Sequence, residues 1–281
     1  MQKILSLILI AVFIVACPFA AIALPTATPT DTIDGSLDDW GVDILDSGGG
    51  DTWVPESGVT YVEEDLRGED AFRVYPGWGG QPFDAEAMFV VCNAEDGYLY
   101  VAIVVGMPST GTTFGSETYY PGDLAIDFEG GTDYEFGVET TGDSGFNQGA
   151  VVRTDESDWE NASELDFPDS WPDQIDDGTV VFYDPDLFVY SGAYTEVADD
   201  GNTYDHYVIE LAIPISVFED FWGLPFTLHW TMTCGNDELN LRCNPPPPVP
   251  EPTTMLMFGA GVAAFAVMRR KKNGRKDSRI S

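Results

Sequence analysis

The chain has 281 residues, of which 44% are hydrophobic and 13% aromatic, and its formal net charge is −36 at pH 7. Between Leu24 and Pro252 it contains four arginines, no lysine and 47 acidic residues, so this part carries −43. Such a surface repels nucleic acid, whose phosphates bind clustered Lys and Arg. The many aromatic residues exclude an acidic disordered chain, so the sequence predicts a folded, acidic body.

Residues 1–23 have the layout of a secretory signal peptide. Lys3 precedes an apolar run, and the small residues Ala21 and Ala23 fit a cleavage site for signal peptidase. Cleavage there leaves Leu24 as the first mature residue. A second reading stays open, because residues 14–17 also fit a bacterial lipobox in which Cys17 is lipidated. Both readings predict an exported protein.

Residues 24–244 are predicted to form one all-β domain, because short apolar runs recur between Gly, Asp, Asn and Pro turns. Predicted strands lie at residues 87–92, 99–105, 124–128, 134–139, 180–183, 207–213 and 226–233. Residues 143–177 are rich in Asp, Ser, Gly and Pro and are predicted to be a long surface insertion. Alternation along residues 207–213 places Glu210 on the face opposite Ile209 and Leu211. The expected fold is an antiparallel β-sandwich.

Three sequence segments of the predicted domain resemble a known family. Asp34-Gly35 followed by Trp40, the strand at residues 99–104 and the strand at residues 207–214 are similar to family 9 carbohydrate-binding-like (DOMON-like) domains. The resemblance implies a sandwich of the jelly-roll kind and a non-catalytic role in binding carbohydrate.

Sugar binding needs exposed aromatic platforms beside polar groups, because ring faces stack on the apolar faces of pyranoses. Four tryptophans lie in Gly-, Pro- or Asp-rich stretches and are the candidate ligand contacts: Trp53, Trp78, Trp159 and Trp171. For each of them, packing in the core or under a loop is the competing reading.

A calcium ion is a candidate cofactor, because closely placed carboxylates lower their energy by sharing a divalent cation. The candidate ligands are Asp34, Asp127, Glu129, Asn236 and Asp237. Their spacing does not match an EF-hand loop, and a simple solvated acidic surface is the competing reading.

The cysteines and histidines favour structural roles. Cys234 and Cys243 enclose eight residues and are the expected disulfide, with a bridge between Cys92 and Cys234 as the alternative. His206 and His229 lie in or beside apolar strands. Neither a Gly-x-Ser-x-Gly nor a His-Glu-x-x-His motif occurs in the sequence, so we expect no enzyme.

The C-terminus has three parts. Residues 245–254 are a Pro-rich linker containing Pro250-Glu251-Pro252, residues 255–268 are apolar, and residues 269–281 form a basic tail. About 20 apolar residues make a full bilayer span, so residues 255–268 suit a short transmembrane helix with a cytoplasmic tail.

This C-terminal arrangement resembles the PEP-CTERM sorting signal, which is recognised by exosortase. The resemblance implies that the tail is removed and that the helix anchors the protein in the membrane only transiently. A plain, unprocessed anchor is the alternative.

The sequence thus predicts an exported envelope or extracellular-matrix protein, in a biofilm setting, whose partners are exosortase, signal peptidase and polysaccharide. Two alternatives stay open: an acidic structural surface protein that uses divalent cations, and an exported glycoside hydrolase. A hydrolase would need two suitably spaced carboxylates, and this spacing is not readable from sequence.

Overall fold

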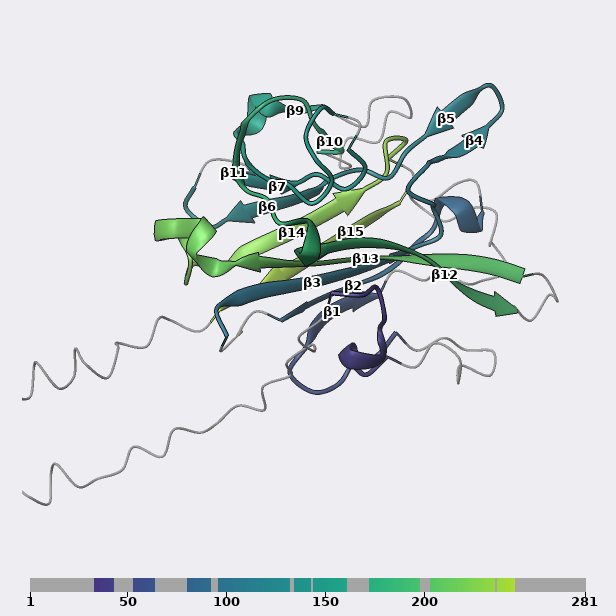
Figure 1. The fold of residues 1–281 in the computed structure, drawn as a ribbon, viewed down its shortest axis with the longest axis horizontal. Coiled ribbons are helices and arrows are strands. Elements are labelled where there is room, and N and C mark those ends of the chain that lie inside the picture. The colour runs from purple at the N-terminus through teal and green to yellow at the C-terminus, as the bar shows by residue number, and fades with distance from the viewer. Residues whose placement is uncertain are drawn as a thin grey trace, which may run out of the picture.

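The computed structural model describes residues 33–42, 53–63, 80–91, 96–131, 134–142, 144–160, 172–197, 203–235 and 237–245. They form antiparallel β-sheets joined by short 3-10 helices, as Figure 1 shows, so the all-β prediction is confirmed. The predicted signal segment (residues 1–23) and sorting segment (residues 255–268) lie outside the described residues. Within the described part, the structure has no helix long and apolar enough to cross a membrane.

The first large sheet has five strands in the order β1-β2-β3-β13-β12. Their bounds are β1 Thr60–Glu63, β2 Ala85–Val91, β3 Tyr98–Val105, β12 Phe188–Val197 and β13 Thr203–Pro214. Apart from Glu86, strands β2 and β3 consist of apolar and aromatic residues, and all but the half-buried Tyr98 are buried. A sheet of this kind needs a covering layer on each side.

The second large sheet has six strands in the order β11-β8-β7-β6-β14-β15. Their bounds are β6 Leu124–Phe128, β7 Phe136–Val138, β8 Val151–Arg153, β11 Thr179–Phe182, β14 Phe226–Thr231 and β15 Glu238–Cys243. Two hairpins lie apart from it: β4 Thr112–Phe114 with β5 Glu117–Tyr119, and β9 Trp159–Glu160 with β10 Gln174–Ile175. The 3-10 helices are η1 Asp38–Trp40, η2 Gln81–Phe83, η3 Glu156–Asp158, η4 Pro185–Leu187 and η5 Ile215–Phe221.

The main core lies between the two large sheets. Its first-sheet side includes Ile209, Leu211 and Ile213 of β13, as the predicted alternation requires. On the other side, Phe128 of β6 contacts Phe226 and η5 residue Phe221, with ring centroids 5.1 and 5.5 Å away. Helix η5 therefore closes one end of the sandwich with aromatic side chains.

The outer face of the first sheet is covered by the N-terminal segment. Trp40 and Trp53 pack there against residues such as Phe89 of β2. Glu210 of β13 holds this segment: one carboxylate oxygen accepts hydrogen bonds from the backbone N–H of Asp34 (3.0 Å) and Gly35 (2.7 Å), and the other accepts from Trp40 Nε1 (3.0 Å). The Asp34-Gly35 turn and Glu210 thus form one connection between the chain's first described residues and a central strand.

Gly35 is required at this connection for two reasons. Its φ of 77° is a left-handed conformation that side chains rarely adopt, and an added Cβ would lie 2.5 Å from Ser191 Cβ. Any larger residue would push the turn away from Glu210.

The predicted surface insertion at residues 143–177 is partly wrong. Its residues Val151–Arg153 form β8, which pairs with β7 and β11 inside the second sheet. A three-residue strand next to acidic turns carries too short an apolar pattern to be recognised from sequence.

The expected disulfide between Cys234 and Cys243 is also wrong. Cys243 is disulfide-bonded, whereas Cys234 is a buried thiol. The reason is geometric: Cys243 pairs with Phe226, at one end of the β14–β15 hairpin, and Cys234 follows Thr231, at the other end. Strands rise about 3.3 Å per residue, so the two cysteines lie far beyond the roughly 7 Å Cα separation that a disulfide spans.

We predict that Cys92 is the partner of Cys243. Cys92 directly follows β2, and Ala85 at the start of β2 donates its N–H to Asp237 at the start of β15 (2.8 Å), so both strands end on the same side of the core. The bond would join the two sheets and close a loop of about 150 residues, worth about 5 kcal/mol. Non-reducing peptide mapping should find the Cys92–Cys243 pair, and Cys243→Ser should lower the free energy of unfolding by about that amount.

Cys234→Ser is the matched control, because it should leave the disulfide intact. Recovery of a cross-linked peptide containing Cys234 would contradict the assignment.

Glu210 gives a second prediction. Glu210→Ala removes the acceptor of three N–H groups, two of them buried, and should lower the free energy of unfolding by about 3 kcal/mol. Urea titration measures this change. Ser191→Ala, on the neighbouring strand β12, should have a much smaller effect.

Glu210 also makes the free energy of unfolding depend on pH. Burial raises the pKa of Glu210 from 4.5 to about 7, against the N–H donors that lower it. Because the folded state binds the proton more tightly than the unfolded state, Glu210's contribution to stability is greatest below pH 4.5 and is lost as the pH rises through 7. In Glu210→Gln this part of the pH dependence should disappear; an unchanged profile would contradict the assignment.

Candidate functional site

The predicted tryptophan platforms do not form an exposed surface in the described part of the molecule. Trp53 is 1% exposed, and its ring centroid lies 5.6 Å from that of His206, in a T-shaped arrangement. Trp159 is 7% exposed; its indole lies against Gly137 of β7, where an added Cβ would be 2.6 Å from the ring. Trp78 and Trp171 lie outside the described residues. The exposed-platform reading of Trp53 and Trp159 is therefore wrong: their surroundings in sequence are polar, but each covers the face of a sheet.

The predicted calcium ligands are not brought together. Glu129 forms an ion pair with Arg242, Asp34 lies in the turn held by Glu210, and Asp237 is buried, where it accepts the Ala85 N–H. Asp127 is on β6, paired with Thr227, and Asn236 is outside the described residues. No group of three or more His, Cys, Asp or Glu residues suited to a metal occurs within the residues that the structure describes.

Buried carboxylates instead bind backbone N–H groups. Besides Glu210 and Asp237, Asp123 accepts from Thr140 N (2.8 Å) and Ile175 N (2.9 Å), and Glu135 accepts from Phe128 N (2.9 Å). Glu139 accepts from Gly142 N (2.7 Å). Asp123 and Glu135 thus fix one strand or loop to another, and Glu139 stabilises the turn that follows it.

Both histidines are buried, as expected for structural residues. His206 Nδ1 lies 3.0 Å from Glu86 Oε1, and neither side chain is exposed. His229 Nδ1 lies 2.8 Å from Asn240 Oδ1, and burial lowers the pKa of His229, which favours the neutral ring.

A cluster on the outer face of the second sheet surrounds Tyr134. Its ring centroid lies 6.2 Å from Trp159 and 6.4 Å from His229. Nearby, Asp173 O accepts from Asp123 N (2.6 Å), and burial raises the pKa of Asp173 to about 6. Trp159 of β9 and Ile175 of β10 pack on this face, against Ala125 and Val152 of the second sheet.

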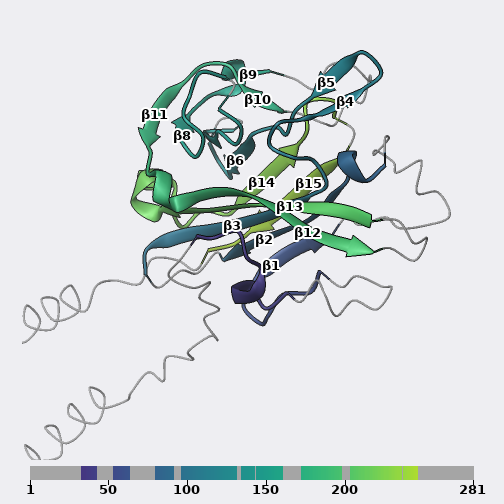
Figure 2. The ribbon, with the colours of Figure 1, turned by 45° about the vertical axis from the view of Figure 1, so that its right-hand side comes forward.

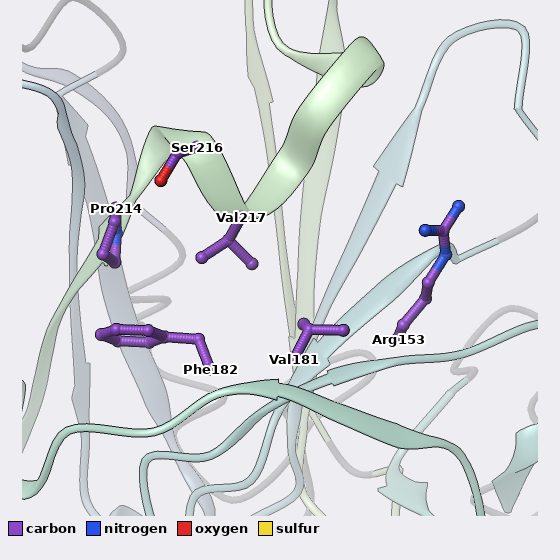
Figure 3. A pocket seen from close by; sticks show the side chains of 6 residues that line it. All are labelled: Arg153, Val181, Phe182, Pro214, Ser216 and Val217. Atoms are coloured by element: carbon purple, nitrogen blue, oxygen red, sulfur yellow. The ribbon is translucent and has the colours of Figure 1, made fainter.

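An open pocket of about 410 Å³ lies at the η5 end of the sandwich. We call it the seam pocket, because edge strand β11 lines one side and the β13–η5 junction lines the other. Figure 3 shows Ser216 and Val217 on the side that faces Phe182 and Val181. The lining residues are Arg153, Val181, Phe182, Pro214, Ser216 and Val217.

Arg153 supplies the charge of the seam pocket. Its guanidinium carbon lies 5.8 Å from the ring centroids of both Phe136 and Phe221, in cation–π geometry. These rings belong to the core and to η5, so they hold the arginine in place. The pocket thus combines apolar walls, one fixed multidentate N–H donor and the Ser216 hydroxyl.

The sequence reasoning missed this pocket. Val181 and Phe182 were predicted to lie on a strand, but nothing in the sequence brings residues 153, 182 and 217 together. Arg153 could have been singled out from sequence, because it is one of only four arginines between Leu24 and Pro252, where the net charge is −43.

Comparison with known proteins finds one family match. No curated protein and no solved structure matches the chain. Residues 248–271 match the PEP-CTERM protein-sorting motif, so the chain carries this sorting signal. The motif begins three residues after Pro245, the last residue that the structure describes.

Proposed function

We propose that this chain is an exosortase-sorted surface protein whose sandwich is a non-catalytic binder of extracellular polysaccharide. The observation that carries the sorting part is the PEP-CTERM match at residues 248–271, directly behind β15. Such a signal implies export to the cell envelope or outer surface, with exosortase as the processing partner.

The seam pocket supports the binding part of the proposal. Its volume lies within the range of about 300–1,000 Å³ that is usual for small-ligand sites. The Phe182 ring and the apolar walls suit the C–H face of a sugar ring, and the Arg153 N–H groups and the Ser216 hydroxyl suit its hydroxyls. The net charge of −43 favours an uncharged polysaccharide over an anionic one.

The non-catalytic part is supported by the way buried carboxylates are used. Glu210, Asp237 and Asp123 have backbone N–H groups on their oxygens and hold the fold together. Catalysis of glycoside hydrolysis needs two carboxyl groups about 5–10 Å apart that flank a substrate cleft, and among the side chains that the structure describes none of those lining the seam pocket is Asp or Glu.

The sorting proposal predicts that changing the motif blocks processing. Pro250→Ala with Glu251→Ala should leave an uncleaved chain in the membrane fraction, because the site read by exosortase is lost. Intact-mass measurement of the surface form checks this. Asp277→Ala, outside the matched residues, should be processed normally. Normal processing of the double variant would contradict the proposal.

The binding proposal predicts that filling the seam pocket weakens retention on polysaccharide. Val217→Trp should occupy the pocket, and Arg153→Ala should remove its main N–H donor; each should weaken binding by about tenfold, equivalent to about 1.4 kcal/mol. Affinity electrophoresis in gels containing neutral or anionic polysaccharides measures this.

Val180→Ala is the control, since Val180 is exposed on the same strand but does not line the pocket. Equal mobility of the exported protein in all gels would contradict the binding proposal. Binding that required calcium and ignored the pocket variants would instead favour a divalent-cation role.

A further inference from the structure

The last described residues and the seam pocket lie at the same end of the sandwich. Cys243, the last residue of β15, pairs with Phe226, the first residue of β14, and η5 shortly precedes β14 in the chain. Pro214 and two residues of η5 line the seam pocket. Figures 1 and 2 both show η5 at the end of the sandwich opposite the β4–β5 hairpin. The Pro-rich linker therefore leaves the body at the end that carries the pocket.

The linker is long enough to reach the pocket. Arg153 of the pocket lies on β8, and four strand spacings separate β8 from β15 in the second sheet, about 19 Å. Residues 246–252 contain five prolines, a composition that favours an extended polyproline helix. At about 3.1 Å per residue, these seven residues span about 22 Å. The Pro250-Glu251-Pro252 motif can thus reach the pocket while staying at the η5 end.

The walls of the pocket suit a proline-rich segment. Val181, Phe182 and Val217 offer apolar surface that includes one aromatic ring. Proline-rich segments bind grooves lined by aromatic side chains, because their preformed helix loses little conformational entropy on binding. Proline has no N–H, so the backbone of such a segment offers mainly carbonyl oxygens. The Ser216 hydroxyl and the Arg153 N–H groups are donors that match these carbonyls.

Charge complementarity also favours the linker. Glu251 is the only charged residue in the range 245–268. The guanidinium of Arg153 has five N–H donors in a planar fork, which suits a carboxylate. Arg242, the other arginine among the described residues, forms an exposed ion pair with Glu129, and exposed ion pairs contribute little to stability. The pocket arginine is therefore the favoured partner of the motif.

We infer that residues 246–252 occupy the seam pocket of their own chain before processing, with Glu251 paired to Arg153. The consequence of this contact rests on the proposed function, because linker and polysaccharide then compete for one site. A tethered segment has an effective concentration on the order of millimolar at a site within its reach. The unprocessed chain is thus autoinhibited, and a polysaccharide that displaces the linker exposes the motif that exosortase reads.

Site-directed photo-crosslinking tests the contact without any polysaccharide. The full-length chain is made in a host without exosortase, so that it stays unprocessed. A benzoylphenylalanine probe at position 182 should cross-link to residues 246–252, as identified by peptide mass spectrometry. The same probe at position 180 is the matched control and should not, because Val180 is exposed on the same strand but does not line the pocket.

The charge pairing has its own matched pair of variants. In the chain with the probe at position 182, Arg153→Ala should lower the yield of this cross-link several-fold, because Glu251 loses its partner. Arg242→Ala should leave the yield unchanged, although Arg242 is closer to the linker in sequence.

Retention in gels containing a soluble neutral polysaccharide tests the competition. A pocket that is about nine-tenths occupied by the linker binds its ligand about tenfold more weakly. In the unprocessed chain, Glu251→Gln should therefore strengthen retention by up to about tenfold. Asp277→Asn is the matched control, because it makes the same chemical change in the basic tail and should have no effect.

The outcomes separate the two proposals. If the probe at position 182 does not cross-link to the linker, the inference is overturned, whatever the retention. Cross-links between two chains, detected by mixing isotope-labelled and unlabelled protein, would overturn it in favour of the linker of a second copy. If the unprocessed chain and Glu251→Gln are retained equally, the autoinhibition is overturned and the proposed function stands. If no form is retained on any polysaccharide, the proposed function falls, and the cross-link alone decides whether the linker docks.

Discussion

The fold depends on buried carboxylates that bind backbone N–H groups. A body with four arginines and no lysine cannot neutralise its buried acids with cations, and isolated buried charges are costly. Glu210, Asp237, Asp123 and Glu135 resolve this by accepting N–H groups from other strands and loops, and Glu139 does so within its own turn. The composition alone would place all the acidic residues at the surface, but these side chains are buried. Their hydrogen bonds connect the N-terminal layer, the loops and both sheets.

The sequence predicted most of the apolar strands, because each carries an apolar run bounded by turn residues, but it missed the ten-residue strand β12, whose sequence is more polar. All seven predicted strands overlap observed ones, including β3 and β13. Short strands such as β8, with three residues, carry too little pattern to be recognised. The Cys234–Cys243 pairing failed for another reason: closeness in sequence does not imply closeness across a hairpin whose two strands separate the residues along its length.

The candidate sites were harder to predict than the fold. Tryptophans in polar stretches were candidates for exposed platforms, with core packing as the competing interpretation, and Trp53 and Trp159 are buried over sheet faces by contacts that only the tertiary structure creates. Conversely, Phe114 is exposed because its hairpin projects from the sandwich, and Arg153 enters a pocket because η5 folds back toward β11. Position in the fold, rather than neighbours in sequence, decides exposure. The resemblance to carbohydrate-binding sandwiches remains a prediction about the body.

The connection between Glu210 and the Asp34-Gly35 turn also constrains how the protein reaches its native state. Asp34 and Gly35 are separated from Glu210 by 176 and 175 residues, and Trp40 by 170, so the N-terminal segment has no site to dock on until β13 is in place. Contacts of such long range slow folding. The N-terminal layer can therefore close over the first sheet only late in folding.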